Sequence, residues 1–536
     1  MLLKTSETMF KILISDKLGA AGLERLDQME NVTYDVKTNL SKDELLETIP
    51  LYDALIIRSG TQVDADVLTA GTNLKVVGRA GIGIDNVDVD AATLRGIIVM
   101  NTPTANNIAT AEQTLALMLA VSRYTAVAHA SVKAGEWNRS QFVGTQLHGK
   151  SLGIIGFGRI GRLVAARAQA FGMEVLAYDP YVSEEVGREK GVTLVDLDEL
   201  LPVVDYISLH TAITPETTKM INDDTLSQMK DGVVIINAAR GKLIDETALA
   251  RALQSGKVKA AALDVYSTEP PQDNPLVGLP NVLHTPHLGA SSVEAQRNVA
   301  IEVVEQVVDA LRGDDFRNTL NMPFQVGAGF AAIRPYMNLA EILGKLHAGL
   351  AMGPIQHVEV QVNGDAVKGL VRAIAAALLK GILESVYHEG PLNYINAPVI
   401  AEKLGLSITQ TTSIEAIDYA NLITCQATWE GGSRKLAGVL FGGSEPRIVQ
   451  FDEYQLDARP QGVVLVMQNR DVPGVIGQIG TMLAAYDVNI GEWRMGRHRP
   501  GSEALSFINL DSIPPNAVLD ALSKISAVTS LKLVNL

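Results

Sequence analysis

Short apolar runs alternate with segments of helical pattern from the start of this 536-residue chain. The runs are continuously apolar rather than alternately apolar and polar, a pattern typical of parallel strands covered on both faces. The chain is therefore expected to fold as an α/β protein. The first series has strand-like runs at Lys11–Ile14, Ala54–Ile57, Leu74–Val77 and Ile97–Val99, with helices expected at Leu23–Met29 and Lys42–Thr48.

A second α/β series follows a long helix expected at Ile108–Val121, which is apolar nearly all round and so is expected to be buried. Six strand-like runs in this series match the strand count of a doubly wound nucleotide-binding sheet. The next helix, Ser292–Leu311, is expected to return to the first domain and make it discontinuous. The six runs are Leu152–Ile155, Glu174–Tyr178, Tyr206–Leu209, Val233–Asn237, Ala260–Asp264 and Val282–Thr285.

The remainder of the chain changes character twice. Residues 325–460 read as mixed strands around an Ala-rich helix, Val371–Leu383, without a catalytic constellation. From residue 462 the pattern predicts a βαββαβ order, which is the ferredoxin-like split unit. Its strands are expected at Val463–Met467, Asn489–Met495, Ala504–Leu510 and Val528–Leu533, and its helices at Val475–Tyr486 and Pro515–Ile525.

A G-x-G-x-x-G pattern formed by Gly156, Gly158 and Gly161 follows the first strand of the second series. The pattern alone is weak in a chain with 46 glycines, but here it also opens a helix. Glycines at this turn let backbone N–H groups approach a pyrophosphate at the positive end of the helix. Asp179 ends the next strand, where an acid can bind ribose hydroxyls and repel a 2′-phosphate, so NAD is favoured over NADP.

Three polar residues follow the later strands of the same sheet: Arg240, Glu269 and His287. Ligands of open α/β sheets bind at the carboxyl ends of the strands, so these three side chains are expected to converge. An arginine can hold a carboxylate, a histidine can accept a hydroxyl proton, and a glutamate can orient the imidazole. The set suits hydride transfer to or from a hydroxy acid. His284 is interpreted as structural, and His210 as a loop-shaping or cofactor-wall residue rather than an acid–base.

Composition limits the class of protein further. At about 100–200 residues per domain the length predicts three or four domains. The formal net charge of -15 argues against nucleic acid as the main partner. The single cysteine, Cys425, favours a reducing compartment, and the opening stretch Met1–Phe10 lacks the apolar core of a signal peptide. No run is long enough to span a membrane, so a cytoplasmic location is expected. No metal site is expected.

Several stretches resemble the D-isomer-specific 2-hydroxy acid dehydrogenases, and the whole chain is similar to the long-form D-3-phosphoglycerate dehydrogenases among them. Over the first 320 residues the resemblance is carried by Val77–Asp88, Asn101–Pro103, Gly153–Gly161, Asn237–Gly241, Glu269-Pro270 and His287–Gly289. Asn393–Pro398 and Phe441–Ile448 resemble the intervening domain of that family. Asn469–Gly474 resembles the first turn of an ACT domain.

The resemblance implies NAD-dependent oxidation of 3-phospho-D-glycerate to 3-phosphohydroxypyruvate, the first step of serine biosynthesis. It implies that Arg240, Glu269 and His287 are catalytic. It also implies that NAD contacts Arg159, Ile160, Asp179, Thr211, Ala238, Asp264 and Gly289, and that the substrate phosphate and carboxylate contact Arg58, Ser59, Gly81, Ile82 and Gly83. Arg79 either adds positive field or forms a structural salt bridge. Trp137-Asn138-Arg139 resembles an element that crosses the dimer interface, which places Arg139 near the partner's site or makes the segment an interface anchor only.

The expected architecture has four parts. A flavodoxin-like, discontinuous substrate-binding domain covers residues 1–103 and 292–320, and a Rossmann NAD-binding domain covers 104–291. An α+β intervening domain for regulation or assembly covers 325–460, and a ferredoxin-like ACT domain covers 462–536. A homo-oligomer, dimer or tetramer, is expected.

Two functional questions stay open at this point. ACT domains of this enzyme often bind L-serine. However, Asn469 stands where serine-responsive members often have histidine, and Asp471 adds negative charge, so an assembly module without a ligand is the alternative. The alternatives for the whole chain are a glyoxylate or hydroxypyruvate reductase, which usually lacks the C-terminal modules, and a non-enzymatic dinucleotide-sensing corepressor.

Overall fold

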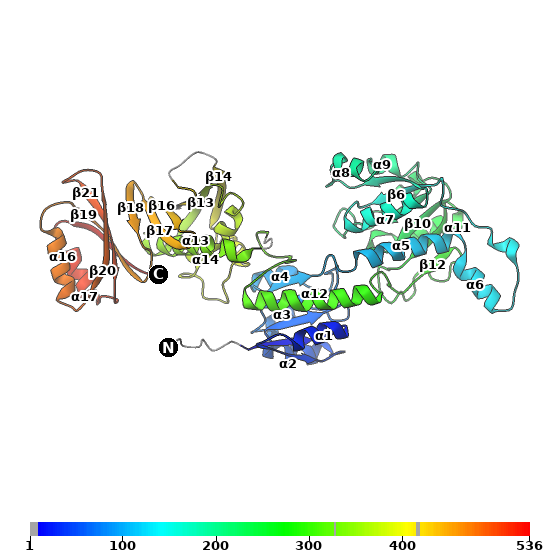
Figure 1. Ribbon diagram of the computed structural model, residues 1–536, viewed down its shortest axis with the longest axis horizontal. Coiled ribbons are helices and arrows are strands. Elements are labelled where there is room, and N and C mark those ends of the chain that lie inside the picture. Colours follow the sequence, from blue (N-terminus) through cyan, green and yellow to red (C-terminus); the bar gives the residue numbers. More distant parts are fainter. Residues whose placement is uncertain (1–8, 326–328, 414–418) are drawn as a thin grey trace.

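The computed structural model describes residues 9–325, 329–413 and 419–536. Most of the opening stretch Met1–Phe10, and residues 326–328 and 414–418 of the expected domain 325–460, lie outside the described residues. The described chain forms four sheets arranged along an elongated molecule (Figure 1). This mixed α/β architecture confirms the fold class predicted from the alternating pattern.

The first sheet is parallel and has the strand order β2-β1-β3-β4-β5, which is flavodoxin-like. One face is covered by α2 (Lys42–Thr48), α3 (Ala65–Ala70) and α4 (Val89–Leu94), and the other by α1 (Ala20–Asp27) and α12 (Val293–Arg312). A Cβ atom at Gly78 would lie 2.4 Å from Val307 Cγ2, so glycine lets α12 pack closely on the sheet. The strands are β1 (Phe10–Ile14), β2 (Val32–Val36), β3 (Ala54–Ile57), β4 (Val76–Arg79) and β5 (Ile98–Asn101).

The second sheet is parallel and has the order β12-β11-β10-β9-β6-β7-β8. Because β6 lies between β7 and β9, the strand order reverses there, and this switch point is where a doubly wound sheet binds its ligand. The strands are β6 (Ser151–Ile155), β7 (Glu174–Tyr178), β8 (Thr193–Leu194), β9 (Tyr206–Leu209), β10 (Val233–Asn237), β11 (Val258–Leu263) and β12 (Val282–His284). The helices beside it include α7 (Arg159–Ala170), α8 (Glu184–Glu189), α9 (Leu197–Leu200), α10 (Asp223–Gln228) and α11 (Glu246–Ser255).

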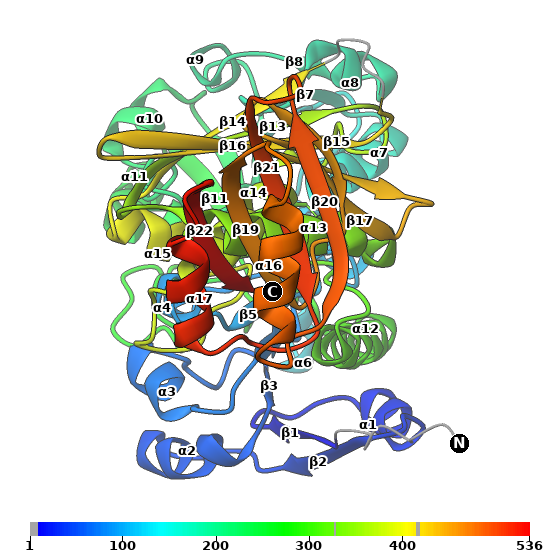
Figure 2. The same cartoon turned by 90° about the vertical axis from the view of Figure 1, so that its left-hand side faces the viewer.

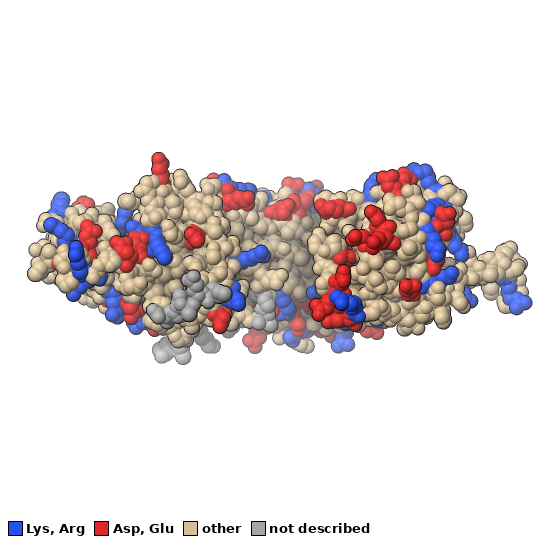
Figure 3. All heavy atoms as spheres, turned by 90° about the horizontal axis from the view of Figure 1, so that it is seen from above, with Lys and Arg blue, Asp and Glu red and all other residues tan. Residues whose placement is uncertain are grey.

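A long helix, α5 (Asn107–Ser122), packs on α7 and on the second sheet, and α6 (Thr125–Lys133) then projects from the molecule (Figure 1). Among the described residues no single helix has the length and apolarity to cross a membrane; α5 and α6 reach them only together, with a bend of 63° between them. α6 has no buried residue. On the face shown in Figure 3, acidic and basic side chains lie interspersed.

The third sheet is mixed, with the order β14-β13-β15-β16-β17-β18, and two packed helices lie against it. The predicted Ala-rich helix is observed as α14 (Val371–Leu383), whereas its partner α13 (Phe330–Leu350) was not predicted, because Pro335 and flanking glycines interrupt its pattern. The other elements are α15 (Ala397–Lys403) and strands β13 (Ile355–Asn363), β14 (Ser407–Ser413), β15 (Leu422–Trp429), β16 (Gly432–Phe441), β17 (Glu445–Phe451) and β18 (Tyr454–Ala458).

The fourth sheet has the order β20-β21-β19-β22, which is the ferredoxin-like arrangement predicted from the βαββαβ pattern. Its helices lie on the outer face (Figures 1 and 2), and inner-face residues such as Val464 and Phe507 join the core of the third unit. The last two units therefore share one hydrophobic core. The elements are β19 (Val463–Arg470), α16 (Val475–Ala484), β20 (Ile490–Arg497), β21 (Glu503–Leu510), α17 (Asn516–Ser523) and β22 (Val528–Asn535).

Candidate active site

The glycine-rich turn between β6 and α7 lies at the switch point of the second sheet. Gly156 has φ +97°, and a Cβ atom there would lie 2.6 Å from the carbonyl carbon of His210. A Cβ atom at Gly161 would lie 2.2 Å from the Gly156 oxygen, whereas one at Gly158 would meet no atom within 4 Å. Two glycines are thus required by the protein's own packing, and Gly158 keeps open the space over the helix N-terminus where a pyrophosphate binds. The turn fits a dinucleotide.

Asp179 follows β7 beside this turn. Its carboxylate accepts hydrogen bonds from the backbone N–H of Phe157 at 2.8 Å and of Tyr181 at 3.0 Å. The carboxylate is therefore fixed against the glycine-rich turn, at the position suited to the hydroxyls of an adenosine ribose. Nearby, Arg159 begins α7 and donates to the Pro103 carbonyl at 3.4 Å, and Ile160 packs against the core of the sheet.

Asp264, directly after β11, organises the loop that carries His287. Its buried carboxylate accepts hydrogen bonds from Thr285 Oγ1 at 2.6 Å, Leu288 N at 2.7 Å and Gly289 N at 2.8 Å. His287 donates its own backbone N–H to the Asp264 carbonyl at 2.8 Å and has φ +55°, a left-handed conformation that is uncommon for a residue other than glycine. These bonds hold the strained backbone that orients the imidazole.

His287 and Glu269 form a pair at the carboxyl edge of the sheet. The distance between His287 Nδ1 and Glu269 Oε2 is 2.7 Å, and Glu269 Oε1 accepts from the Tyr266 N–H at 3.1 Å. Burial acts to raise the pKa of Glu269, but the hydrogen bonds from His287 and from Tyr266 outweigh it and lower the pKa below its usual value. Glu269 therefore stays ionised, and Nε2 of His287 is left for a reacting group.

Arg240 reaches across from the second sheet to the loop after β4. Its Nε lies 3.0 Å from Asp85 Oδ2, and its Nη1 donates to the Ala239 carbonyl at 2.7 Å. A Cβ atom at Gly83 would lie only 1.7 Å from Nη2 of Arg240. The structure thus brings Gly83, predicted from the first domain, against Arg240, predicted from the second.

Positive charge gathers at this junction. Arg79, at the end of β4, has a buried Nε that has no hydrogen-bond partner among the described residues, and its Nη1 lies beside Gly81. Burial lowers the pKa of Arg79 to about 10, and the charges of Arg240 and Arg58 add to this effect. No ion pair of Arg79 occurs within the described chain, so the structure favours the positive-field interpretation. The backbone N–H of Arg58 donates to Asp16 Oδ2 at 2.6 Å, and its Nη1 donates to the Lys17 carbonyl at 3.5 Å.

The remaining predicted residues divide into two groups. Thr211 and Ala238 lie at the carboxyl ends of β9 and β10, and Ser59 and Ile82 lie in loops of the first sheet. Arg139 does not join them: it lies after the projecting α6, at the start of a short 3-10 helix, and its side chain forms no hydrogen bond or ion pair to another described residue. The backbone of His210 packs against Gly156 of the glycine-rich turn. Burial lowers the pKa of His210 to about 4, and its Nε2 lies 2.8 Å from Ser208 Oγ.

Two acidic residues of the site escaped the sequence analysis. Asp85 pairs with Arg240, and Glu246, the first residue of α11, accepts hydrogen bonds from the backbone N–H and the hydroxyl of Ser267. Asp85 stands inside the Val77–Asp88 stretch that carried the resemblance, so its position was available as a signal. Glu246 has no such signal, because it acts on a loop that is distant in sequence.

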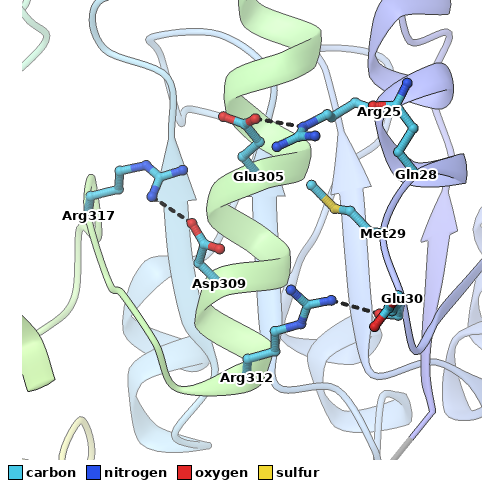
Figure 4. Close-up of a pocket in the computed structure, with 8 residues that line it drawn as sticks. All are labelled: Arg25, Gln28, Met29, Glu30, Glu305, Asp309, Arg312 and Arg317. Carbon is cyan, nitrogen blue, oxygen red and sulfur yellow. Dashed lines mark hydrogen bonds and ion pairs between the residues drawn. The ribbon is translucent and has the colours of Figure 1, made fainter.

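A pocket of about 490 Å³ lies elsewhere, at the far end of α12 (Figure 4). α12 begins near the His287 loop and rises about 1.5 Å per residue, so its residues Glu305, Asp309 and Arg312, which line the pocket, lie about 20–30 Å along the helix from that loop. Its arginines are already bonded: Arg25 to Glu305 at 2.8 Å, Arg317 to Asp309 at 2.6 Å and Arg312 to the Glu30 carbonyl at 2.7 Å. The pocket is therefore a surface network of ion pairs that joins α12 to the first sheet's periphery.

Three family profiles match the chain in succession. The profile of the D-isomer specific 2-hydroxyacid dehydrogenase NAD binding domain matches residues 115–289, and that of the D-3-phosphoglycerate dehydrogenase intervening domain matches 332–452. The ACT domain profile matches residues 463–527.

Curated relatives match over the full length. A D-3-phosphoglycerate dehydrogenase of Methanocaldococcus jannaschii is 41% identical over 98% of this chain and 100% of its own. The enzyme of the same name from Bacillus subtilis is 38% identical over 98% of this chain and 100% of its own.

Solved structures match the first two sheets. A glyoxylate reductase from Paecilomyes thermophila has a TM-score of 0.54 at 36% identity and covers 58% of this chain and 98% of its own. A D-lactate dehydrogenase from Aquifex aeolicus, complexed with NAD and lactic acid, has a TM-score of 0.52 at 30% identity and covers 57% of this chain and 96% of its own.

Proposed function

Because the chain belongs to the D-3-phosphoglycerate dehydrogenases, within the D-isomer-specific 2-hydroxyacid dehydrogenase family, we propose that Arg240, Glu269 and His287 carry out its reaction. That reaction is the NAD-dependent oxidation of 3-phospho-D-glycerate to 3-phosphohydroxypyruvate, which opens serine biosynthesis. The observation that carries the assignment of roles is the 2.7 Å contact between His287 and Glu269, at the sheet edge that Arg240 also occupies.

NAD, when bound along the glycine-rich turn, supplies the acceptor for the hydride from the substrate's hydroxyl-bearing carbon. His287 accepts the hydroxyl proton at Nε2, because its Nδ1 faces Glu269 at 2.7 Å. The ionised Glu269 stabilises the imidazolium that forms and holds the ring in one orientation. Asp264 helps to position His287, since it fixes the loop around this residue through three hydrogen bonds.

Arg240 holds the substrate carboxylate and polarises the carbonyl that develops during oxidation. The substrate phosphate is assigned to Arg58, Ser59 and the backbone N–H groups of Gly81, Ile82 and Gly83. The buried Arg79 adds positive potential behind this loop. Together these groups form a locally cationic site on a chain whose net charge is -15, which suits a substrate with both a phosphate and a carboxylate.

The assignment is tested by NADH formation from 3-phospho-D-glycerate and NAD with the purified full chain, and turnover is expected. Turnover of glyoxylate or hydroxypyruvate without activity on 3-phospho-D-glycerate would instead identify a reductase. The full-length relatives and the two C-terminal domains support the dehydrogenase over that reductase and over a corepressor.

Replacing Asp179 by asparagine is expected to lower the preference for NAD over NADP about 10- to 100-fold. The change removes a charge-assisted hydrogen bond to the ribose and the repulsion of a 2′-phosphate. The ratio of kcat/KM for the two cofactors measures the effect. Asp196→Asn, at an exposed helix N-terminus of the same domain, is the control and should leave the ratio unchanged. An unchanged ratio in Asp179→Asn would reject the ribose role.

The ACT domain is assigned a small effector, for which L-serine, the product of the pathway, is the candidate. The negative charge of Asp471 is offset in the structure, because Arg497 Nη1 lies 2.6 Å from its carboxylate. Asn469 is buried and its side-chain amide donates to the Arg470 carbonyl at 3.0 Å. Adding L-serine to the assay distinguishes the two possibilities: inhibition supports an effector site, and unchanged rates support an assembly module.

A homo-oligomer, a dimer or tetramer, completes the proposal. The projecting α6 segment, with Trp137 74% exposed, offers an apolar surface to a second copy, and Arg139 beside it would then reach the partner's substrate site. The division into domains at 1–103 with 292–320, 104–291, 325–460 and 462–536 is part of the same proposal. A cytoplasmic location is consistent with the free, buried thiol of Cys425.

A further inference from the structure

The intervening domain contacts the first sheet through a four-residue turn, Asn393-Tyr394-Ile395-Asn396, which we call the clasp. Asn393 Nδ2 donates to the Gly96 carbonyl at 2.7 Å, where the chain enters β5, and Ile395 is buried in the core formed by the first sheet and α12. On its other side Tyr394 donates to Glu341 Oε2 on α13 at 3.1 Å. The clasp therefore fastens one domain to the other at the beginning of β5.

The free edge of β5 is also covered by chain that leads into the intervening domain. Leu320 N donates to the Val99 carbonyl at 2.8 Å, and Val99 N donates to Asn321 Oδ1 at 3.0 Å. Residues 318–321 thus run beside β5 and pair with both its carbonyl and its N–H groups. Because β5 is the edge strand of its sheet, these contacts fix it on the side where no other strand does.

The opposite end of β5 bears directly on the residues assigned to the substrate. Asn101, the last residue of β5, donates from Nδ2 to the Ile82 carbonyl at 2.6 Å, and Thr102 N donates to the Gly81 carbonyl at 3.0 Å. The Asn101 carbonyl in turn accepts from the fully buried Gln306 at 2.8 Å. Only the four residues of β5 separate the clasp from the loop of Gly81, Ile82 and Gly83.

We propose that the intervening domain positions the Gly81–Gly83 loop through β5, and that Asn393 is a positioning residue for the oxidation. β5 is held at both ends, by β4 along one edge and by residues 318–321 along the other, so its four residues move as a unit. A shift of the clasp is therefore transmitted to the loop that binds the substrate. This inference rests on the proposed function, because it takes the Gly81–Gly83 loop as the substrate's site. It makes the intervening domain part of the substrate site's geometry.

The test compares two matched substitutions in the intervening domain. Asn393→Asp keeps the oxygen that accepts from Ile395 N at 2.9 Å, but it places a carboxylate against the Gly96 carbonyl. Asn421→Asp makes the same change where the amide donates to the Leu440 carbonyl at 3.1 Å and accepts from Leu440 N at 2.9 Å, within the third sheet and away from β5. Both lose one hydrogen bond to a carbonyl, and only the first lies on the clasp.

Asn393→Asp is expected to raise KM for 3-phospho-D-glycerate about 3- to 10-fold, the cost of one hydrogen bond, with kcat and KM for NAD unchanged. Hydrogen–deuterium exchange of the peptide that contains residues 81–83 is expected to accelerate in the same variant. Asn421→Asp should change neither. An unchanged KM, unchanged exchange, or equal effects in both variants would overturn the inference. If the wild type does not oxidise 3-phospho-D-glycerate, the proposed function fails and the exchange comparison alone decides the coupling.

Discussion

The His287→Ala variant is expected to lose NADH formation from 3-phospho-D-glycerate by about 10²- to 10⁴-fold in kcat, the range typical of a general base. The hydroxyl proton must leave as the hydride does, and His287 is the group whose ring is oriented for it by the 2.7 Å bond to Glu269. Steady-state kinetics at saturating NAD and substrate measure the loss.

The binding of NADH should be unchanged in His287→Ala, because Asp264 is fixed through backbone N–H groups and Thr285 rather than through the imidazole. His148→Ala, at an exposed position before β6, is the matched control and should keep wild-type rates. A His287→Ala enzyme within tenfold of the wild type would show that another group accepts the proton.

The Arg240→Ala variant is expected to lose about 10²- to 10³-fold in kcat/KM, comparable to the loss of one donor to a developing oxyanion. Arg240 is the cation that faces the loop containing Gly83, and its fork can bind a carboxylate with two hydrogen bonds. Arg240→Lys should recover only part of the loss, since an ammonium group is a point charge without that planar fork.

Arg251→Ala provides the control for Arg240. Arg251 belongs to α11 of the same domain and pairs with Asp223 at 2.6 Å on the surface, where an ion pair contributes about 0–1 kcal/mol. Its removal should leave kcat/KM unchanged. Full recovery in Arg240→Lys would reject two-point binding of the carboxylate, and a loss below tenfold in Arg240→Ala would remove Arg240 from the reacting centre.

The sequence located most strands of the first two sheets and missed β2 and β8. Ala54–Ile57 and Val233–Asn237 are continuously apolar and were located to the residue. β2 was missed because it carries Thr33 and Asp35 at the edge of its sheet, and β8 has only two residues. An edge strand that carries polar side chains, such as β2, is not found by hydrophobicity alone.

The sequence likewise identified some features of the candidate site and missed others. Gly156, Asp179, Arg240, Glu269 and His287 could be named because each stands at a fixed distance from a recognisable strand. Contacts between domains could not be named, since the pairing of Arg240 with Asp85 joins residues 155 positions apart. Arg79 shows a further limit. The sequence allowed either a structural salt bridge or a contribution to positive potential, and only the packing around the guanidinium distinguishes the two.

The placement of α12 has a consequence for how the chain folds while it is being synthesised. The face of the first sheet that includes Ile12, Ile56 and Val76 is covered largely by Val299, Val303 and Val307 of α12. About 200 residues of the second sheet's domain lie between them, which at about 5–20 residues per second takes about 10–40 s to synthesise. During that interval the nucleotide domain can fold to completion, while the substrate domain still exposes half of its core. The growing chain therefore exposes an apolar sheet face until α12 has been synthesised.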